Sequence, residues 1–355
     1  MIVALDDAPD VVAVVPTLGG ALPRLRTCLE SVLASATRAR LAVVVVWNDP
    51  RREVPPDLPG PVAVLEPGLN LGFPGGLAHA RAAAARRAPG ARQLWLVQDD
   101  VVVEPDCLER LLGRLAGADA PGVVAPVALD GRGLVPARSR GGVLDEAGGM
   151  DHWFPVDDVA PGDLDVGHRL DYVASSGALV ALAAWDAVGG FDPGYHPLLW
   201  SDVDFCFRAG RAGYGAVLEP AARIRHAGSA STPGVLSLYV AGAHAERFRR
   251  VFAGEPPVVA APVTADAALV ATVAQVAATA VVEVAALGTR LLRERDEALG
   301  PLAAHRDALA AQCDALALEA ERLRVELAAT RSTLSWRVTA PLRAVRRWGR
   351  RNVTP

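Results

Sequence analysis

The first hundred residues alternate short apolar runs with stretches of helical spacing. Three short, apolar runs rich in β-branched residues predict strands, the first of them buried: Val11–Thr17, Leu41–Trp47 and Val62–Leu65. Leu22–Leu33 carries apolar residues at helical spacing, and an alanine-rich stretch over residues 77–87 predicts a second helix. Strands that alternate with helices predict a parallel, doubly wound α/β sheet of the nucleotide-binding type.

A fourth apolar run ends in two adjacent carboxylates. The predicted strand ends at Gln98, Asp99 and Asp100 follow it, and Pro105 fits the first turn of the next helix. The acids therefore lie at the carboxyl end of a strand, where open α/β sheets bind ligands. Adjacent acids are costly unless a cation holds them. They indicate either a divalent metal that carries a substrate diphosphate, or a solvated turn or helix cap.

Three glycines stand where the third strand passes into the second helix. In Asn70-Leu71-Gly72-Phe73-Pro74-Gly75-Gly76 they would let the backbone approach an anion at the helix N-terminus. The spacing is not GxGxxG, so a dinucleotide fingerprint is absent. A tight turn without a ligand explains the glycines equally well.

The middle of the chain is less regular. Residues 130–170 are rich in Gly, Asp and Pro without periodicity, which indicates a functional lid or a disordered loop. Residues 172–180 and 217–224 then predict strands, and a helix is expected over residues 200–212.

Two acids and a histidine in this region are candidates for chemistry. Asp202 and Asp204 lie about 200° apart on the predicted helix, so they cannot both face one ligand. One can point into a cleft while the other caps or pairs, or both can be N-terminal charges favoured by the helix dipole. His226 follows the last predicted strand, where a lone histidine is either structural or a ligand.

The composition narrows the partners and the compartment. A length of 355 residues suits one large domain plus extra segments. The net charge of −4 implies no general attraction to nucleic acid, and the four widely spaced cysteines argue against a zinc site or a disulfide framework. The N-terminus lacks the basic region and long apolar core of a signal peptide, so a cytoplasmic enzyme is expected.

The C-terminal third separates from the α/β region at Pro256 and Pro257. Residues 265–287 are apolar and long enough to span a bilayer, but the internal Gln275 and Glu283 favour a packed or interfacial helix.

A heptad pattern follows from Pro301. Leucine recurs every seven residues, at Leu302, Leu309, Leu316 and Leu323. This predicts a coiled coil of about four heptads that would join copies of the chain, or a helix packed on the globular domain. Residues 331–355 hold seven arginines and no acid, with interspersed tryptophans, which suits an anionic membrane surface.

Several of these segments together resemble the family-2 glycosyltransferases, in the branch of rhamnosyl- and galactofuranosyl-type enzymes. The resemblance covers about residues 11–252. The matching pieces are Val14-Val15-Pro16-Thr17, Asn70 to Gly76, Asp99-Asp100, Gly189-Gly190-Phe191-Asp192, Asp202-Val203-Asp204-Phe205 with Arg208, His226 with Gly228, and Glu246-Arg247. The tail over residues 334–343 resembles tails of bacterial surface-polysaccharide glycosyltransferases.

The resemblance implies a GT-A fold, a dTDP- or UDP-sugar donor and inversion at the anomeric carbon. Asp100 and His226 match the family's metal ligands for Mn²⁺ or Mg²⁺, and Asp202 matches its catalytic base. The implied donor contacts are Pro16, Thr17, Asn48, Asn70, Gly72, Phe73, Gly75, Gly76, Gln98 and Asp99. The implied acceptor contacts are Ser176, Gly177, Trp200 and Ser201.

Three positions depart from the family pattern. Trp47 precedes Asn48 where the family has Asp, which bears on recognition of the nucleotide base. Gln98 replaces the first acid of the DxD motif, so metal binding would rest on Asp100 with help from Asp99. Ser201 replaces the Glu that precedes the base, which removes one charge near it.

The sequence thus predicts an inverting, metal-dependent glycosyltransferase that acts on a cell-envelope glycan or a lipid-linked acceptor. The expected organisation is a GT-A domain over residues 1–252, a linker and apolar helix over 253–300, a coiled-coil helix over 301–331 and a basic tail over 332–355. The tail would place the enzyme at the inner face of the plasma membrane. A sugar nucleotidyltransferase and a catalytically degenerate coiled-coil scaffold are the alternatives.

Overall fold

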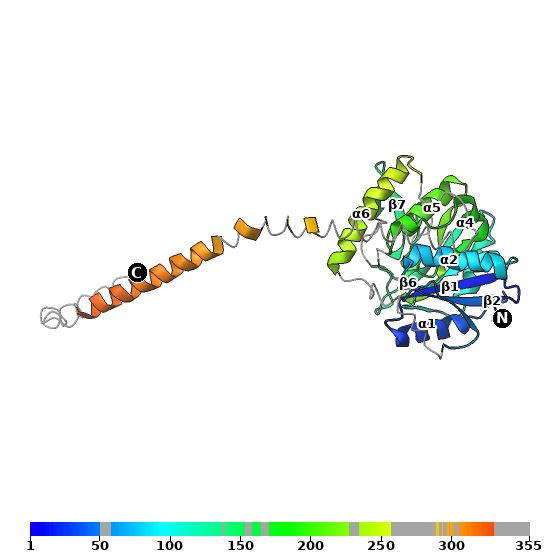
Figure 1. Cartoon of the computed structure of the whole chain (residues 1–355), viewed down its shortest axis with the longest axis horizontal. Coiled ribbons are helices and arrows are strands. Elements are labelled where there is room, and N and C mark those ends of the chain that lie inside the picture. Colours follow the sequence, from blue (N-terminus) through cyan, green and yellow to red (C-terminus); the bar gives the residue numbers. More distant parts are fainter. Residues whose placement is uncertain are drawn as a thin grey trace, which may run out of the picture. The chain divides into compact units, whose positions relative to one another are not determined.

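The chain forms two compact units, Met1–Ala286 and Leu287–Pro355, in a computed structural model (Figure 1). The structure describes residues 1–49, 58–136, 139–152, 158–164, 170–226, 234–256, 289–290, 293, 297, 299–301 and 305–329. Most of the expected linker and all of the expected basic tail lie outside the described residues.

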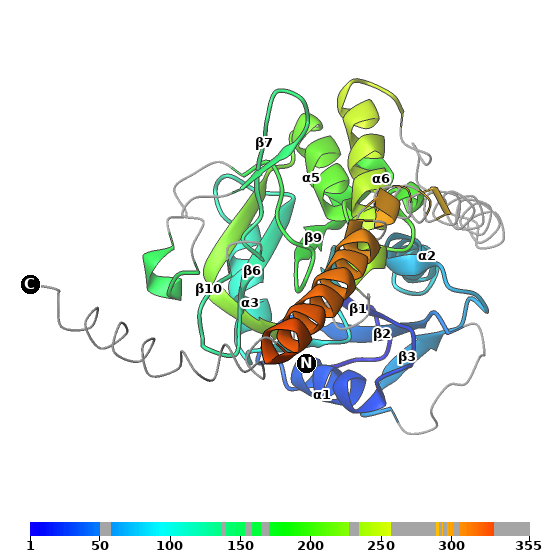
Figure 2. The ribbon, with the colours of Figure 1, turned by 90° about the vertical axis from the view of Figure 1, so that its left-hand side faces the viewer.

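An eight-stranded sheet stands at the centre of the first unit (Figure 2). Its strands lie in the order β3-β2-β1-β4-β9-β6-β10-β5. Their bounds are β1 Val11–Thr17, β2 Leu41–Trp47, β3 Val62–Leu65, β4 Gln93–Leu96, β5 Val101–Val103, β6 Val123–Leu129, β9 Leu179–Ala181 and β10 Ala216–His226. A separate two-stranded sheet pairs β7 Gly142–Leu144 with β8 Met150–His152.

The sheet is mixed, so the expectation of a purely parallel sheet was wrong. Strands β3, β2, β1 and β4 are parallel, and β6 is parallel to β10. Strand β9 is inserted antiparallel between β4 and β6, and β5 pairs antiparallel with the end of β10. Hydrophobic runs reveal which segments form strands, but strand direction depends on long-range pairing that no local pattern reports.

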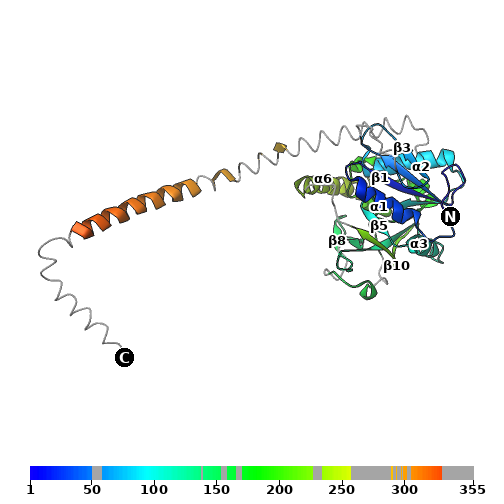
Figure 3. The ribbon, with the colours of Figure 1, turned by 90° about the horizontal axis from the view of Figure 1, so that it is seen from below.

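Helices cover both faces of the sheet, which confirms the doubly wound α/β class. Their bounds are α1 Leu22–Leu33, α2 Gly72–Arg87, α3 Cys107–Leu115, α4 Leu182–Val188, α5 Ser201–Arg211 and α6 Gly234–Phe252, with short 3₁₀ turns η2 Pro161–Asp163 and η3 Pro193–Tyr195. Helices α2, α5 and α6 lie on one side of the sheet and α1 on the other (Figure 2). Figure 3 looks onto the face that α1 and α3 cover.

Alternate residues of each central strand supply the two cores. Val12 and Val14 of β1 join the core with α2, α4, α5 and α6, whereas Val11 and Val15 join the core with α1 and α3. Side chains alternate across a strand, so a sheet covered on both faces needs a continuous apolar run. This is why β1 and β2 read as unbroken hydrophobic sequence.

The predicted boundaries of three elements were wrong. Helix α2 begins at Gly72 instead of residue 77, because the glycines themselves form its first turns. Helix α3 begins at Cys107, and Pro105 lies in the turn before it. The strand expected over residues 172–180 is reduced to β9, because Gly177 has a left-handed φ of 76° that interrupts an extended chain.

The described part of residues 130–170 contains the β7–β8 hairpin and η2, so this segment carries some secondary structure.

In the second unit, residues 305–329 form a helix. Its seam leucines are exposed, and Arg322 forms ion pairs with Glu319 and Glu326 along the helix. Among the described residues, no helix is long and apolar enough to cross a membrane. Residues 265–287 lie outside the described part of the chain.

Candidate functional site

Polar side chains gather where β1, β2 and β4 end. Thr17 closes β1, Asn48 follows β2, and Gln98, Asp99 and Asp100 follow β4. The three strands are parallel neighbours in register, with Thr17 paired to Trp47 and Val14 to Leu96, so their carboxyl ends meet at one edge. This edge is where open α/β sheets bind ligands.

Asp99 is held by the end of β1. The Thr17 hydroxyl donates to Asp99 Oδ2 at 2.6 Å, and the Gly19 amide donates to Thr17 Oγ1 at 3.1 Å. Burial raises the pKa of Asp99, the bond from Thr17 opposes that rise, and the nearby charge of Asp100 adds to it. Asp99 therefore orders the start of the loop after β1.

Asp100 and His226 meet at the edge of the sheet. His226 ends β10, whose antiparallel pairing places it opposite Val101, and its Nε2 lies 3.3 Å from Asp100 Oδ1. The Asp100 side chain is 7% exposed and that of His226 is 24% exposed. The structure thus brings together two predicted metal ligands that lie far apart in the sequence. Among the described residues, no group of three or more His, Cys, Asp or Glu side chains is arranged to hold a metal ion.

Gln98 occupies the expected position of an acid and is tied to the loop before β9. The Ser176 hydroxyl donates to Gln98 Oε1 at 2.9 Å. The next residue, Gly177, accepts a bond from Trp95 Nε1 at 2.9 Å and donates to the Leu96 carbonyl at 2.7 Å. Ser176 and Gly177, expected at the acceptor, therefore lie against the end of β4.

Glycines of the Asn70–Gly76 stretch pack closely against other segments of the domain. Gly72 has a φ of 67°, and a Cβ there would lie 2.7 Å from both His196 Nδ1 and the Pro197 carbonyl oxygen. The Phe73 amide donates to that same carbonyl at 2.6 Å, so this helix N-terminal amide already has a protein partner. The Asn70 side chain accepts from the Gly72 amide at 2.8 Å. The roles of Asn70, Gly72 and Phe73 in donor binding stay predictions.

Asn48 closes the other side of this stretch. It is 3% exposed, and its side chain donates to the Gly72 carbonyl at 3.1 Å. A Cβ at Gly76 would lie 3.2 Å from Asn48 Nδ2 and 3.5 Å from Pro16 Cβ, so Gly76 allows α2 to approach β1 and β2. Gly75 is buried in the same turn. Trp47, which stands where the family has Asp, is buried beneath Gly19.

Asp202 and Asp204 point in different directions, as their helical spacing requires. Asp202 is partly exposed and accepts bonds from the Ser175 amide at 3.3 Å and the Val203 amide at 3.0 Å. Burial raises the pKa of Asp202, and these bonds oppose the rise. Asp204 is fully buried, pairs with Arg208 and accepts from the Tyr195 hydroxyl at 3.4 Å.

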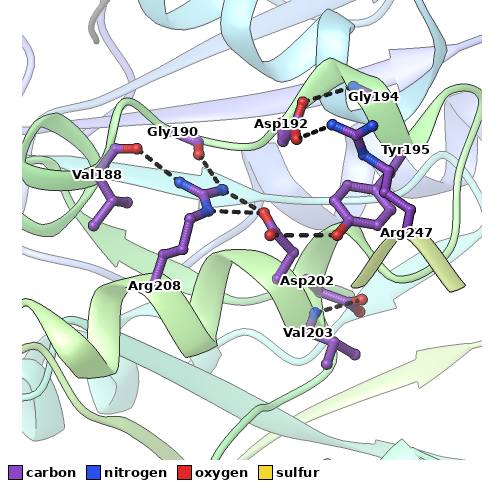
Figure 4. Close-up of polar contacts among 10 residues, drawn as sticks. Val188, Gly190, Asp192, Gly194, Tyr195, Asp202, Val203, Arg208 and Arg247 are labelled. Carbon is purple, nitrogen blue, oxygen red and sulfur yellow. Dashed lines mark hydrogen bonds and ion pairs between the residues drawn. The ribbon is translucent and has the colours of Figure 1, made fainter. Parts of the chain in front are cut away.

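A cluster of charged side chains lies beside α5 (Figure 4). The sequence indicated only some of its members. Arg247 of α6 donates to Asp192 at 2.7 Å, and its guanidinium lies 5.3 Å from the centre of the Tyr195 ring. A Cβ at Gly194 would lie 2.4 Å from that guanidinium, so a larger residue there would displace it. Asp192 and Arg247 stood in the matching motifs, whereas Tyr195 gave no local signal.

Trp200 and Ser201, expected at the acceptor, are buried where α5 begins. The Trp200 ring packs against Phe248 of α6 with centroids 5.5 Å apart. Trp200 also has a left-handed φ of 66°. Any contact of these two residues with an acceptor stays a prediction.

The first unit is a doubly wound α/β domain with acids at the edge of its sheet where open α/β sheets bind ligands. The chain belongs to glycosyltransferase-like family 2, because a sequence model of that family matches residues 9–253. This membership confirms the family inferred from the sequence, and the mixed α/β sheet agrees with the GT-A class that the family implies.

Curated relatives occur in two strains of Mycobacterium tuberculosis, CDC 1551 / Oshkosh and ATCC 25618 / H37Rv. Both are named N-acetylglucosaminyl-diphospho-decaprenol L-rhamnosyltransferase and are 28% identical to this chain over 190 residues. The alignment covers 48% of this chain and 60% of each relative, so the chain spans less than two thirds of their length.

Two solved structures resemble the chain more distantly. GalNAc-T7 with UDP, GalNAc and Mn²⁺ has a TM-score of 0.46 and 14% identity, covering 66% of this chain and 48% of that one. The mannosyltransferase PcManGT from Pyrobaculum calidifontis, in complex with GDP-Man and Mn²⁺, has a TM-score of 0.45 and 18% identity, covering 82% and 81%.

Asp204→Asn is expected to lower the free energy of unfolding by about 3–5 kcal/mol, because it leaves the buried Arg208 without its counter-charge. Asp106→Asn is the matched control, since Asp106 and Arg110 form a pair with the same i, i+4 spacing whose side chains are 49% and 47% exposed. That change should cost only about 0–1 kcal/mol. Urea denaturation measures both, and equal losses would contradict a structural role for Asp204.

Proposed function

We propose that the chain is an inverting, metal-dependent glycosyltransferase that moves a sugar from a nucleotide-sugar donor to a hydroxyl group. One observation carries the proposal: the consecutive residues Ser175 and Ser176 link Asp202 to Gln98. The Ser175 amide donates to Asp202 and the Ser176 hydroxyl donates to Gln98, which precedes Asp99 and Asp100. This link supports the proposal that Asp202 and the acids at the sheet edge belong to one site.

The proposed substrates follow from the relatives and from the site. The relatives are named N-acetylglucosaminyl-diphospho-decaprenol L-rhamnosyltransferase, which supports a lipid-linked or cell-envelope glycan acceptor here. The proposed dTDP- or UDP-sugar donor is the one that the family resemblance implies. Asp99 and Asp100 at the strand ends suit a diphosphate that arrives with a cation.

Asp100 and His226 are proposed to hold Mn²⁺ or Mg²⁺. A carboxylate oxygen and an imidazole nitrogen 3.3 Å apart fit two positions of an octahedral shell, and the remaining positions would be filled by phosphate oxygens and water. The bound cation would neutralise the negative charge that develops on the leaving nucleoside diphosphate.

Asp202 is proposed to take the proton from the acceptor hydroxyl. Hydrogen bonds from the Ser175 and Val203 amides hold its carboxylate. Asp202 is partly exposed, whereas Asp204 is buried in its pair with Arg208. A raised pKa makes a carboxylate a stronger base once it is ionised. A single displacement with this base would invert the anomeric centre.

The C-terminal unit is proposed to bring the enzyme to its acceptor. The arginine-rich tail, which lies outside the described residues, would bind the anionic inner face of the plasma membrane. The helix over residues 305–329 would pair with a second copy through Leu309, Leu316 and Leu323. Glu319 and Arg324 flank this seam five residues apart, a spacing that allows ion pairs between two parallel helices.

Metal removal tests the cation site. EDTA should abolish sugar transfer and added Mn²⁺ or Mg²⁺ should restore it. Asp100→Asn keeps the size of the side chain but removes its charge, so it should weaken Mn²⁺ binding in the presence of UDP or dTDP. The free Mn²⁺ signal in electron paramagnetic resonance measures that binding. Asp106→Asn is the control, and full activity in EDTA would refute the assignment.

Asp202→Asn tests the base. Turnover should fall by about 10²–10⁴-fold, because the amide cannot accept a proton, while donor affinity is unchanged. Since burial raises the pKa of Asp202, the rate of the wild-type enzyme should fall with acidification at a pH above 3.8, the ordinary value. Asp204→Asn serves as the comparison and should keep its turnover per folded molecule. Near-wild-type turnover in both variants would place the base elsewhere, for example in residues 130–170.

Oxidation at Cys313 tests the pairing of the helix. Cys313 is exposed and lies on the seam four residues after Leu309, whereas Cys28, Cys107 and Cys206 are buried. A parallel pair in register should therefore give a disulfide-linked dimer with copper phenanthroline. Cys313→Ser should abolish the dimer, and Leu316→Arg should greatly reduce it. A dimer that Leu316→Arg leaves unchanged would show that random collision, not this seam, brings the thiols together.

A further inference from the structure

The segment that leads into α5 contains a costly backbone turn. Leu199 and Trp200 are consecutive residues with left-handed φ angles of 74° and 66°. Residues with a Cβ rarely adopt this conformation, and it persists only where surrounding contacts enforce it. The turn lies immediately before α5, whose second residue is Asp202.

His244 of α6 binds this turn directly. Its Nδ1 lies 3.1 Å from both the Leu198 and the Leu199 carbonyl oxygens. Because both partners are acceptors, Nδ1 must carry the proton and donate to them. Only 5% of His244 is exposed. This burial lowers its pKa to about 4, so the ring is neutral near pH 7.

Two neighbours of His244 on the same face of α6 hold the rest of the segment. Arg247, three residues on, donates to Asp192 at 2.7 Å (Figure 4), and Phe248, four residues on, packs against Trp200. Residues three and four apart share one face of a helix. One face of α6 therefore contacts the segment over residues 192–200 at three places. These are its first residue, Asp192, the carbonyl groups of the turn, and its last residue, Trp200.

Hydrogen bonds of α5 and of its neighbouring loop connect the turn to Asp202, the proposed base. The Trp200 carbonyl accepts the Asp204 amide at 2.9 Å and so opens the hydrogen-bond ladder of α5. Asp202 lies between Trp200 and Asp204 in the sequence. Its Oδ2 accepts a hydrogen bond from the Ser175 amide at 3.3 Å. A turn that relaxed would rotate the first turn of α5 and lengthen this contact.

We propose that His244 is a positioning residue, which fixes Asp202 by locking the Leu198–Leu199 carbonyls and the left-handed turn at Trp200. The proposal rests on the function proposed for Asp202. His244 touches neither substrate nor Asp202 in this role. It acts through the backbone of the turn, so a hydrogen-bond donor at its Nδ1 position is the required feature.

The experiment compares two substitutions in the full-length chain. His244→Asn keeps an N–H donor close to the position of Nδ1, whereas His244→Leu keeps an apolar side chain without a donor. His244→Leu should lower kcat about 10–100-fold, as expected for a displaced catalytic group, with the KM for the donor within about twofold. Its loss of rate on acidification should begin at a higher pH, because a carboxylate that loses the Ser175 bond has a higher pKa. His244→Asn should recover most of both effects.

Val251→Ala is the matched control, since it removes buried methyl groups about two turns after His244 on α6. It should leave kcat per folded molecule and its pH dependence unchanged. An equal loss in His244→Asn and His244→Leu, or the same loss in Val251→Ala, would overturn the proposal, because packing alone would then explain the effect.

Hydrogen exchange supplies a readout that needs no activity. The amides over residues 198–204 should exchange faster in His244→Leu than in the wild type or Val251→Ala, while those of β4 stay protected. Unchanged exchange over residues 198–204 would overturn the proposal even if sugar transfer is found. Absence of transfer by the wild type would instead refute the proposed function, and the exchange result would still decide whether His244 locks the turn.

Discussion

The buried pair of Asp204 and Arg208 is the interaction on which the second half of the domain depends. Asp204 is fully buried, and Arg208 also donates to the Val188 carbonyl at 2.7 Å and the Gly190 carbonyl at 2.8 Å. One guanidinium therefore neutralises a buried acid and satisfies the end of α4 at the same time. A buried charge without its partner is strongly destabilising, so the contact between the end of α4 and α5 depends on this pair.

This arrangement gives Asp204 a structural role within the same helical turn as Asp202, for which the chemical role is proposed. Asp204 faces inward and is committed to Arg208 and Tyr195, which leaves Asp202 free to face the Ser175–Ser176 loop. The two acids therefore have separate partners, with Arg208 and Tyr195 on Asp204 and the Ser175 amide on Asp202. Acids two residues apart suit this division because helical geometry turns them to different sides.

Local patterns predicted β1, β2, β3 and α1 with their bounds, because each is a continuous or regularly spaced apolar run, buried in β1 and β2 and partly buried in β3. They could not predict that β9 is antiparallel, since its pairing with β4 and β6 joins distant segments. The meeting of Asp100 with His226 was expected only through the family resemblance. His244 was missed, because a single histidine within a helix carries no periodic or motif signal; its partners are carbonyl groups set by the backbone.

The position of α6 late in the chain has a consequence for how the domain is made. During synthesis, Asp202 and the strand-end acids leave the ribosome well before Arg247 and Phe248 do. The turn at Trp200 can acquire its contacts with α6 only after that helix has emerged, and domains generally fold as units once their sequence is complete. The segment before Asp202 would therefore be ordered last, and a nascent chain that stops before α6 would hold this acid without the helix that contacts the turn beside it.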